Sequence, residues 1–206
     1  AFACDLTDRE QVAATCRRIC DERPSVDLVI YNAGVTQISQ FSDLARETHE
    51  RVMNINYFGA VDVASHFLQP LRQSRGTHLA ISSVAGFAPL VKRTAYAASK
   101  HAMEGFFGSL RAEEARHNVR VCIAAPSFIG TNINRPGVTT DGTERPGSAT
   151  DGVDYMNAGD AARIILNGLR KKKTRILVGR VARLAWLISR LSPSLYAHLM
   201  VRNMRE

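Results

Sequence analysis

Short apolar runs alternate with longer helical patterns along almost the whole chain, and this alternation constrains the fold more than any other feature of the sequence. Apolar runs rich in β-branched residues predict strands at 27–31, 77–83, 119–125 and 176–178. Apolar residues spaced three and four apart predict helices at 7–23, 47–73, 94–117 and 160–172. Such an alternation predicts an α/β fold: a three-layer, doubly wound parallel sheet with helices on both faces.

The ends of the helices and one long loop carry their own signals. Thr7 and Glu10 have capping-box spacing, and Pro24 is expected to end the first helix. Asp160 can cap the last of the four helices, and Gly59 is expected to weaken the helix at 47–73. Residues 132–159 contain two prolines, five glycines and no sustained period. They predict a mobile loop of the kind that forms lids or binding segments.

The charge of the chain is concentrated at its C-terminal end. Lys and Arg outnumber Asp and Glu by 27 to 19, but ten of these basic residues and one acidic residue lie at 170–206. The remaining chain has 17 basic and 18 acidic residues and is nearly neutral. Nucleic-acid-binding proteins usually spread basic residues over their binding face, so this distribution argues against a nucleic-acid partner.

The cysteines and the N-terminal residues favour a reducing compartment. The four cysteines form no CxxC pair and no cluster with histidines at metal-ligand spacing, so we expect free thiols and no metal site. Polar residues interrupt the first apolar positions, which argues against a signal peptide, and no apolar stretch is long enough to span a bilayer. A cytoplasmic protein is therefore expected.

Tyr96 and Lys100 lie one turn apart in the predicted helix at 94–117 and therefore share a face. A phenol exchanges protons poorly at neutral pH, because its ordinary pKa is about 10. Two cations in a poorly solvated pocket could lower that pKa by about three units, which would suit acid–base chemistry on a carbonyl or hydroxyl. The pair alone is a weak indicator, because a snorkelling lysine on an amphipathic helix has the same spacing.

Residues upstream of this pair strengthen the interpretation. Ser83 ends a predicted strand thirteen residues before Tyr96, and Asn56 lies in the helix before that strand. Asn32, Ala33 and Gly34 follow the first predicted strand. With these residues the chain resembles, from about residue 5 to 178, the short-chain dehydrogenase/reductase family of single-domain Rossmann-like enzymes. The family's catalytic tetrad matches Asn56, Ser83, Tyr96 and Lys100.

The resemblance implies a role for each of these residues. Tyr96 would be the general acid or base, and Ser83 would hydrogen-bond the substrate oxygen. Lys100 would bind the nicotinamide ribose and lower the pKa of Tyr96, while Asn56 would hold a water molecule in a proton relay. The resemblance also implies NADP or NAD as cofactor, with contacts from Asp5, Leu6, Asn32, Ala33, Gly34, Tyr96, Lys100, Ile129 and Thr131.

Three features depart from the family pattern. Tyr31 replaces the first residue of the family's Asn-Asn-Ala-Gly motif, and Ser127 follows Pro126 where the family has glycine. The glycine-rich turn that binds the cofactor pyrophosphate has no match in residues 1–206. Residues 1–5 read like the end of a strand, so we expect that the first β-α-β unit is not in this sequence. The other interpretation is a protein without a phosphate site.

Residues 180–206 are predicted to form a basic helical extension of a Rossmann-like catalytic domain at 1–179. Apolar residues between Val181 and Leu191 share one helical face, and Arg183 and Arg190 lie opposite with Trp186 beside them. Pro193 separates a second apolar stripe. Such a segment suits the surface of an anionic membrane, and it equally suits packing over a substrate cleft or a partner subunit.

Together these observations predict an NAD(P)-dependent oxidoreductase that interconverts a secondary alcohol and a ketone or aldehyde, with Tyr96 as general acid/base. The long loop and the apolar tail favour a moderately large apolar substrate. The resemblance implies a homodimer or homotetramer formed by the helices at 47–73 and 94–117. A cytoplasmic location is expected, with peripheral membrane contact through 180–206 as an option. One alternative is a non-catalytic relative that dimerises or docks on membranes without a cofactor. Another is a sugar-nucleotide epimerase, which normally has a larger C-terminal domain.

Overall fold

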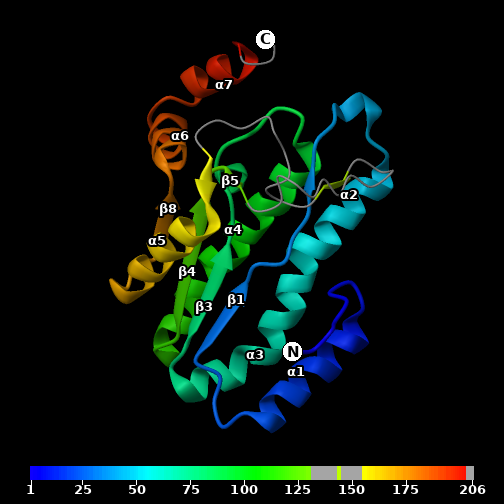
Figure 1. Cartoon of the computed structure of the whole chain (residues 1–206), viewed down its shortest axis with the longest axis vertical. Helices are drawn as coiled ribbons and strands as arrows, with labels where there is room; N and C mark the ends of the chain where they lie inside the picture. The colour runs from blue at the N-terminus through cyan, green and yellow to red at the C-terminus, as the bar shows by residue number, and fades with distance from the viewer. Residues whose placement is uncertain (131–142, 145–154, 203–206) are drawn as a thin grey trace.

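Four parallel strands form the central sheet of the computed structural model, which describes residues 1–130, 143–144 and 155–202. Their order is β1-β3-β4-β8, and each lies within two residues of a predicted strand (Figure 1). They are β1 (Leu28–Tyr31), β3 (Thr77–Ile81), β4 (Arg120–Pro126) and β8 (Arg175–Val178). β1 is an edge strand of this sheet, and its residues Leu28 and Ile30 are 41% and 51% exposed.

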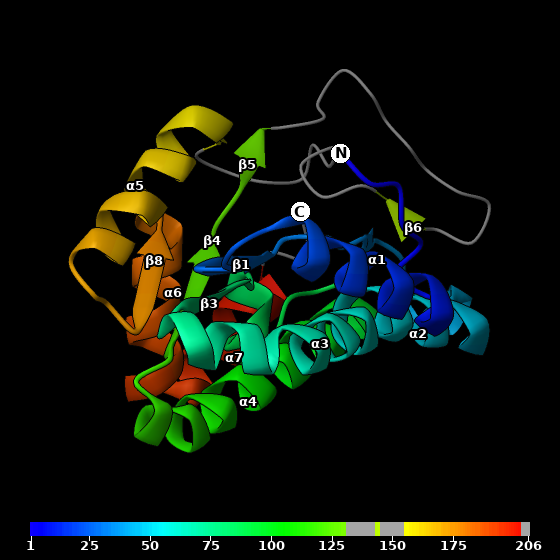
Figure 2. The same cartoon turned by 90° about the horizontal axis from the view of Figure 1, so that it is seen from below.

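Helices cover both faces of this sheet, which confirms the predicted fold class (Figure 2). One face packs against α1 (Arg9–Glu22), α3 (Gly59–Ser74) and α4 (Thr94–Glu114), with Leu71 and Phe107 completely buried between them. The other face packs against α5 (Ala158–Arg170). The apolar residues of β3 and β4 contribute to both cores, as expected for strands buried on both faces.

Two helix caps differ from the prediction. Asp8, not Thr7, caps α1 and accepts hydrogen bonds from the backbone N–H groups of Glu10 and Gln11. Asn157, not Asp160, caps α5. Both capping residues have extended backbone conformations, which place the side-chain oxygen over the free N–H groups of the first turn.

The predicted helix at 47–73 consists of three parts. α2 (Arg46–Met53) and α3 are joined by one π-helical turn, η2 (Asn54–Phe58), which contains Asn56. Gly59 begins α3 directly after the π-helical turn. A Cβ atom there would lie 3.0 Å from that of Leu6, so glycine permits the close approach of the N-terminal segment.

Most of the remaining short elements follow the carboxyl ends of the strands, whereas η4 (Ala115–His117) directly precedes β4 at the opposite edge. η1 (Phe41–Asp43), η3 (Val84–Gly86) and η4 are 3₁₀ turns. Two-residue strands pair β2 (Thr36–Gln37) with β6 (Thr143–Glu144), and β5 (Ile129–Gly130) with β7 (Met156–Asn157). Most of the predicted loop at 132–159 lies outside the described residues.

The C-terminal helices fold back onto the body of the chain. In α6 (Arg180–Leu191) and α7 (Pro193–Arg202), the side chains of Ala182, Ala185 and Tyr196 are buried against the segment after β3. Trp186 lies between two guanidinium groups, at 4.3 Å from Arg175 and 4.1 Å from Arg190. None of the helices within the described ranges is long and apolar enough to cross a membrane.

The sheet encloses a polar pair that the sequence analysis did not anticipate. The Tyr31 hydroxyl lies 2.6 Å from Nδ1 of His78, and both side chains are buried. The unusual Tyr31 therefore hydrogen-bonds across β1 and β3. Burial lowers the pKa of His78 to about 4, although the carboxylate of Glu114 acts in the opposite direction.

This histidine is expected to make the fold sensitive to acid. Its pKa is lower in the folded chain than in the unfolded chain, so its stabilising contribution is present above pH 6.5 and is lost as the pH falls towards 4. The loss is roughly 3 kcal/mol. Denaturant unfolding of His78→Asn between pH 7 and 4.5 should therefore show a smaller pH dependence than the wild type. The control is the exposed His101→Asn, and equal slopes for all three proteins would contradict the prediction.

Candidate functional site

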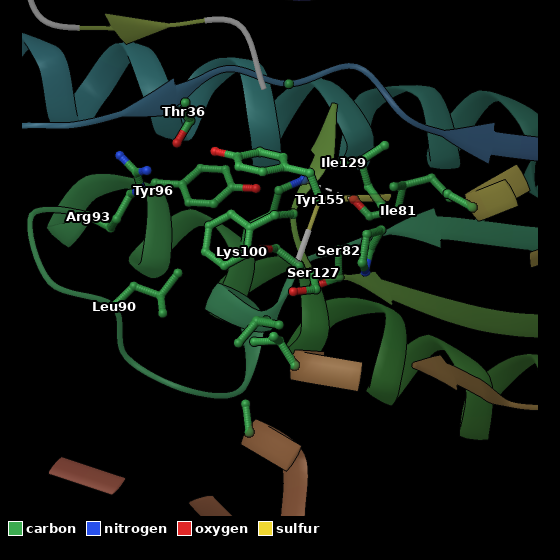
Figure 3. Close-up of a pocket in the computed structure, with 18 of the residues that line it drawn as sticks. Thr36, Ile81, Ser82, Leu90, Arg93, Tyr96, Lys100, Ser127, Ile129 and Tyr155 are labelled. Atoms are coloured by element: carbon green, nitrogen blue, oxygen red, sulfur yellow. Dashed lines mark hydrogen bonds between the residues drawn. The ribbon is translucent and has the colours of Figure 1, made fainter. Parts of the chain in front are cut away.

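The carboxyl ends of β1, β3 and β4 open into a cavity of about 1060 Å³. Its position is the one at which open parallel sheets bind ligands. The segments after these strands and the first turn of α4 line one part of it (Figure 3). Apolar side chains of α5, α6 and α7 line another part, including Ile165, Leu184, Ile188, Leu199 and Met200.

Tyr96 and Ser83 meet inside this cavity. Tyr96 comes from the first turn of α4 and is 9% exposed, and Ser83 caps η3 and accepts a hydrogen bond from the backbone N–H of Ala85. Burial raises the pKa of Tyr96, and a side-chain hydrogen bond with Ser83 and the charge of Arg93 offset this only in part. The predicted lowering of this pKa is therefore wrong for this structure, because burial outweighs the neighbouring positive charge.

Lys100 lies on the same face of α4, as predicted from its spacing. Its ammonium donates a hydrogen bond to the backbone oxygen of Ile81 at 2.9 Å and lies 5.9 Å from the centre of the Tyr96 ring. The side chain is buried, which lowers the pKa of Lys100 to about 8. Lys100 therefore anchors α4 to the end of β3 and keeps a cation at the base of the cavity.

Asn56 lies beneath the cavity and does not line it. Its Oδ1 accepts a hydrogen bond from the backbone of Val35 at 2.8 Å, and its Nδ2 donates to the Val35 oxygen and to the Ser99 hydroxyl. Ser99 in turn donates to the backbone oxygen of Tyr96. Asn56 therefore connects the turn after β1 with the helix that contains Tyr96.

The turn at Gly34 packs closely against two residues of the predicted tetrad. A Cβ atom at Gly34 would lie 3.0 Å from Oδ1 of Asn56 and 3.7 Å from the ammonium of Lys100, so glycine permits this close approach. The predicted cofactor residues Asn32, Ala33, Gly34 and Ile129 line the cavity together with Lys100.

Two predicted cofactor residues near the start of the chain, Asp5 and Leu6, are not among the residues that line this cavity. The Asp5 carboxylate accepts hydrogen bonds from the backbone and hydroxyl of Thr7, which lower its pKa, and Leu6 packs near Gly59. Thr131 lies outside the described residues.

Sequence reasoning missed Arg93, which lines the cavity and is 6% exposed. Its spacing could have indicated it, because Arg93 precedes Tyr96 by three residues and both therefore lie at the start of one helix. The apolar side chains of α6 and α7 form part of the cavity wall, which is one of the options that the sequence left open for residues 180–206. Their stripe of apolar residues predicted a buried face but could not identify the surface that it covers.

Comparisons with known proteins agree with this geometry. The family model for short chain dehydrogenase matches residues 1–141. "Dehydrogenase/reductase SDR family member 7B" from Bos taurus is 34% identical over 204 residues, which is 98% of this chain and 63% of the relative. A 7-like member of the same family from Drosophila melanogaster is 31% identical over 201 residues, 97% of this chain and 62% of the relative. The chain thus spans less than two thirds of these relatives.

Solved structures show the same fold. A short chain dehydrogenase from Burkholderia cenocepacia in complex with NADP superposes with a TM-score of 0.80 at 23% identity, covering 95% of this chain and 76% of that protein. A short-chain dehydrogenase from Streptomyces avermitilis gives 0.78 at 24% identity, covering 97% and 76%. Because the family model matches more than half of the residues of this chain, the chain belongs to the short-chain dehydrogenase/reductase family.

Proposed function

We propose that this protein is an NAD(P)-dependent oxidoreductase that interconverts a secondary alcohol and a ketone, or a primary alcohol and an aldehyde. The observation that supports this most directly is the meeting of Tyr96 and Ser83 in one cavity, which Lys100 and Gly34 also line. Family membership and the NADP and NAD complexes of proteins with the same fold agree with it.

In the reduction direction, Tyr96 donates its proton to the carbonyl oxygen of the substrate. Burial favours the neutral phenol, so the proton is present at neutral pH. The Ser83 oxygen already accepts a hydrogen bond from Ala85, and its own proton can be donated to the same substrate oxygen. Lys100 uses one of its three protons for Ile81 and can offer another to a ribose hydroxyl. A bound nicotinamide would supply or accept the hydride.

The shape of the cavity supports a moderately large apolar substrate. Leu184, Ile188, Leu199 and Met200 of the two C-terminal helices line it, opposite the segment that ends in Tyr96. Apolar pockets with a few convergent polar groups bind the body of a ligand by burial and orient it by hydrogen bonding. The polar groups of this cavity lie around Ser83 and Tyr96, so we expect the reacting carbonyl of the substrate to bind at that end.

Cofactor binding is the first test. We expect the protein to enhance the fluorescence of NADPH or NADH in a saturable titration. Gly34→Val should weaken binding at least about tenfold, since its side chain would displace Asn56 and Lys100, which pack against this turn. The exposed Gly159→Ala is the control. The gene upstream of the Ala1 codon should be sequenced, and any continuation should be included in the protein. Absence of saturable binding in that protein would favour the non-catalytic alternative.

We further propose that the outer face of the C-terminal helices contacts anionic membranes. Leu187, Leu191 and Leu195 are 54%, 76% and 49% exposed, and no acidic residue occurs between 161 and 202. Apolar side chains within a basic segment suit an interface of anionic lipids. Removal of 180–206 is a poor test, because Ala185 and Tyr196 belong to a buried cluster.

Surface substitutions separate membrane contact from folding. The protein should sediment with phosphatidylserine-containing vesicles more than with phosphatidylcholine vesicles. The double variant Leu187→Gln/Leu191→Gln should bind at least about tenfold less, because each substitution removes apolar area worth about 1 kcal/mol or more at the interface. Leu166→Gln, which alters an exposed leucine of α5, is the matched control. Equal sedimentation of all three proteins would exclude this face as the docking surface.

A further inference from the structure

Gln37 is a completely buried polar residue outside the predicted tetrad. Its side-chain amide donates hydrogen bonds to the backbone oxygens of Ser39 at 3.0 Å and Lys92 at 3.2 Å. Its side-chain oxygen accepts one from the backbone N–H of Ala95 at 3.2 Å. Buried amides are costly unless their partners are in place, so Gln37 holds these backbone segments in fixed positions.

The contact with Ala95 lies at the first turn of α4. The first N–H groups of a helix have no partner within the helix, and here Arg93 occupies the N-cap position without a side-chain cap. Gln37 supplies the missing acceptor from β2, a different part of the chain. The backbone of Ser39 also donates to the oxygen of Lys92, so both sides of the junction are tied together.

Arg93 belongs to the same junction. Its guanidinium donates a hydrogen bond to the backbone oxygen of Gln37 at 3.3 Å. The side chain is buried and lines the cavity, and Figure 3 shows it at the same end as Tyr96. Other ionisable side chains among the described lining residues are Lys100 of α4, Tyr155 before α5 and Tyr196 of α7; none of the described lining residues is acidic.

We propose that Gln37 and Arg93 are positioning residues for Tyr96: Gln37 fixes the first turn of α4, and Arg93, held by the Gln37 backbone, keeps a positive charge beside the phenol. The proposal deepens the proposed function, because it concerns the residue assigned as general acid/base. Two cations near the phenol are expected from the sequence, of which Lys100 is one and Arg93 is the other. The charge of Arg93 acts to lower the pKa of Tyr96, although burial outweighs it.

The test reads the ionisation of position 96 directly. A fluorinated tyrosine, whose phenol ionises nearer neutral pH, is incorporated at position 96 by amber suppression and titrated by ¹⁹F NMR. Arg93→Met should raise its midpoint by about one pH unit, the size expected for one nearby charge in a partly solvated site. Arg93→Lys should restore at least half of that shift. Gln37→Met should also raise the midpoint, and adding it to Arg93→Met should produce little further change.

A matched control separates positioning from general loss of stability. Ser74→Ala removes a partly buried hydrogen bond to Val26 at the opposite, amino-terminal edge of the sheet and should leave the midpoint unchanged. An unchanged midpoint in Arg93→Met, or a Gln37→Met shift no larger than that of Ser74→Ala, would overturn the proposal. If Gln37→Met does not fold, the comparison of Arg93→Met with Arg93→Lys decides. This titration needs neither cofactor nor substrate, so its failure is distinguishable from failure of the proposed function, which appears in the NADPH titration and in turnover.

Discussion

Replacing Tyr96 by phenylalanine is expected to reduce carbonyl turnover by at least about 100-fold, because the variant has no proton to give to the substrate oxygen. The fold should be retained, since the ring stays in place and only the hydrogen bond with Ser83 is lost, a change of about 1 kcal/mol. Turnover is measured as oxidation of NADPH or NADH with a panel of apolar ketones that includes 1-phenyl-1,2-propanedione.

The control for this variant is Tyr155→Phe, which removes another phenol from the same cavity. We expect this control to keep most of the wild-type kcat. Binding of the reduced cofactor should be similar in all three proteins, so a loss of turnover reports on proton transfer. Near-normal turnover in Tyr96→Phe would exclude the assigned mechanism even if the cofactor binds.

Arg72→Met is expected to destabilise the fold by about 3 to 5 kcal/mol, because it strands a buried carboxylate. The Arg72 guanidinium forms two hydrogen bonds with Glu114, at 2.9 and 2.6 Å, and the Glu114 side chain is 1% exposed. These hydrogen bonds lower the pKa of Glu114 despite its burial. Urea unfolding at pH 7 measures the loss, and Arg46→Met, which breaks an exposed pair with Glu50, should change stability by less than about 1 kcal/mol.

The pH dependence distinguishes a stranded charge from a simple loss of packing. In the wild type, the contribution of Glu114 is present above its ordinary pKa and is lost as the pH falls through its lowered pKa. In Arg72→Met, burial without a partner should raise that pKa, so protonation restores stability as the pH falls. The difference between the proteins should therefore shrink from pH 7 to 4.5. The double variant Arg72→Met/Glu114→Leu should recover most of the stability, and a constant difference would argue for packing alone.

The sequence was sufficient for the sheet and for the face that Tyr96 and Lys100 share, because both depend on local periodicity. It was insufficient where two chemically suitable residues compete for one position. Asp8 and Asn157 cap their helices because their backbones are extended there. The residue pattern does not show backbone conformation, so it could not distinguish them from Thr7 and Asp160. The sequence does not identify a partner for Glu114, and only the packing of α4 beside α3 brings it to Arg72.

The acid–base assignment shows the same limit. Spacing predicted that Tyr96 and Lys100 lie together, but the balance between burial and charge depends on residues far apart in the sequence. Gln37 and Arg93 are 56 positions apart and meet only because β2 lies against the start of α4. Neither hydrophobic periodicity nor a sequence motif predicts such a contact. The roles of Asn56 and of the cofactor residues remain predictions for the same reason.

Trp186 gives this protein a built-in optical reporter. It is the single tryptophan of the chain, and its indole is stacked between Arg175 and Arg190 with its edge against Phe87. Arg175 is bonded in turn to Glu104 of α4, so the environment of the indole depends on how α6 rests on the body. Any ligand or surface that lifts α6 would expose the indole to water and move its emission to longer wavelength. Movement of the cavity wall can therefore be followed in the unlabelled protein.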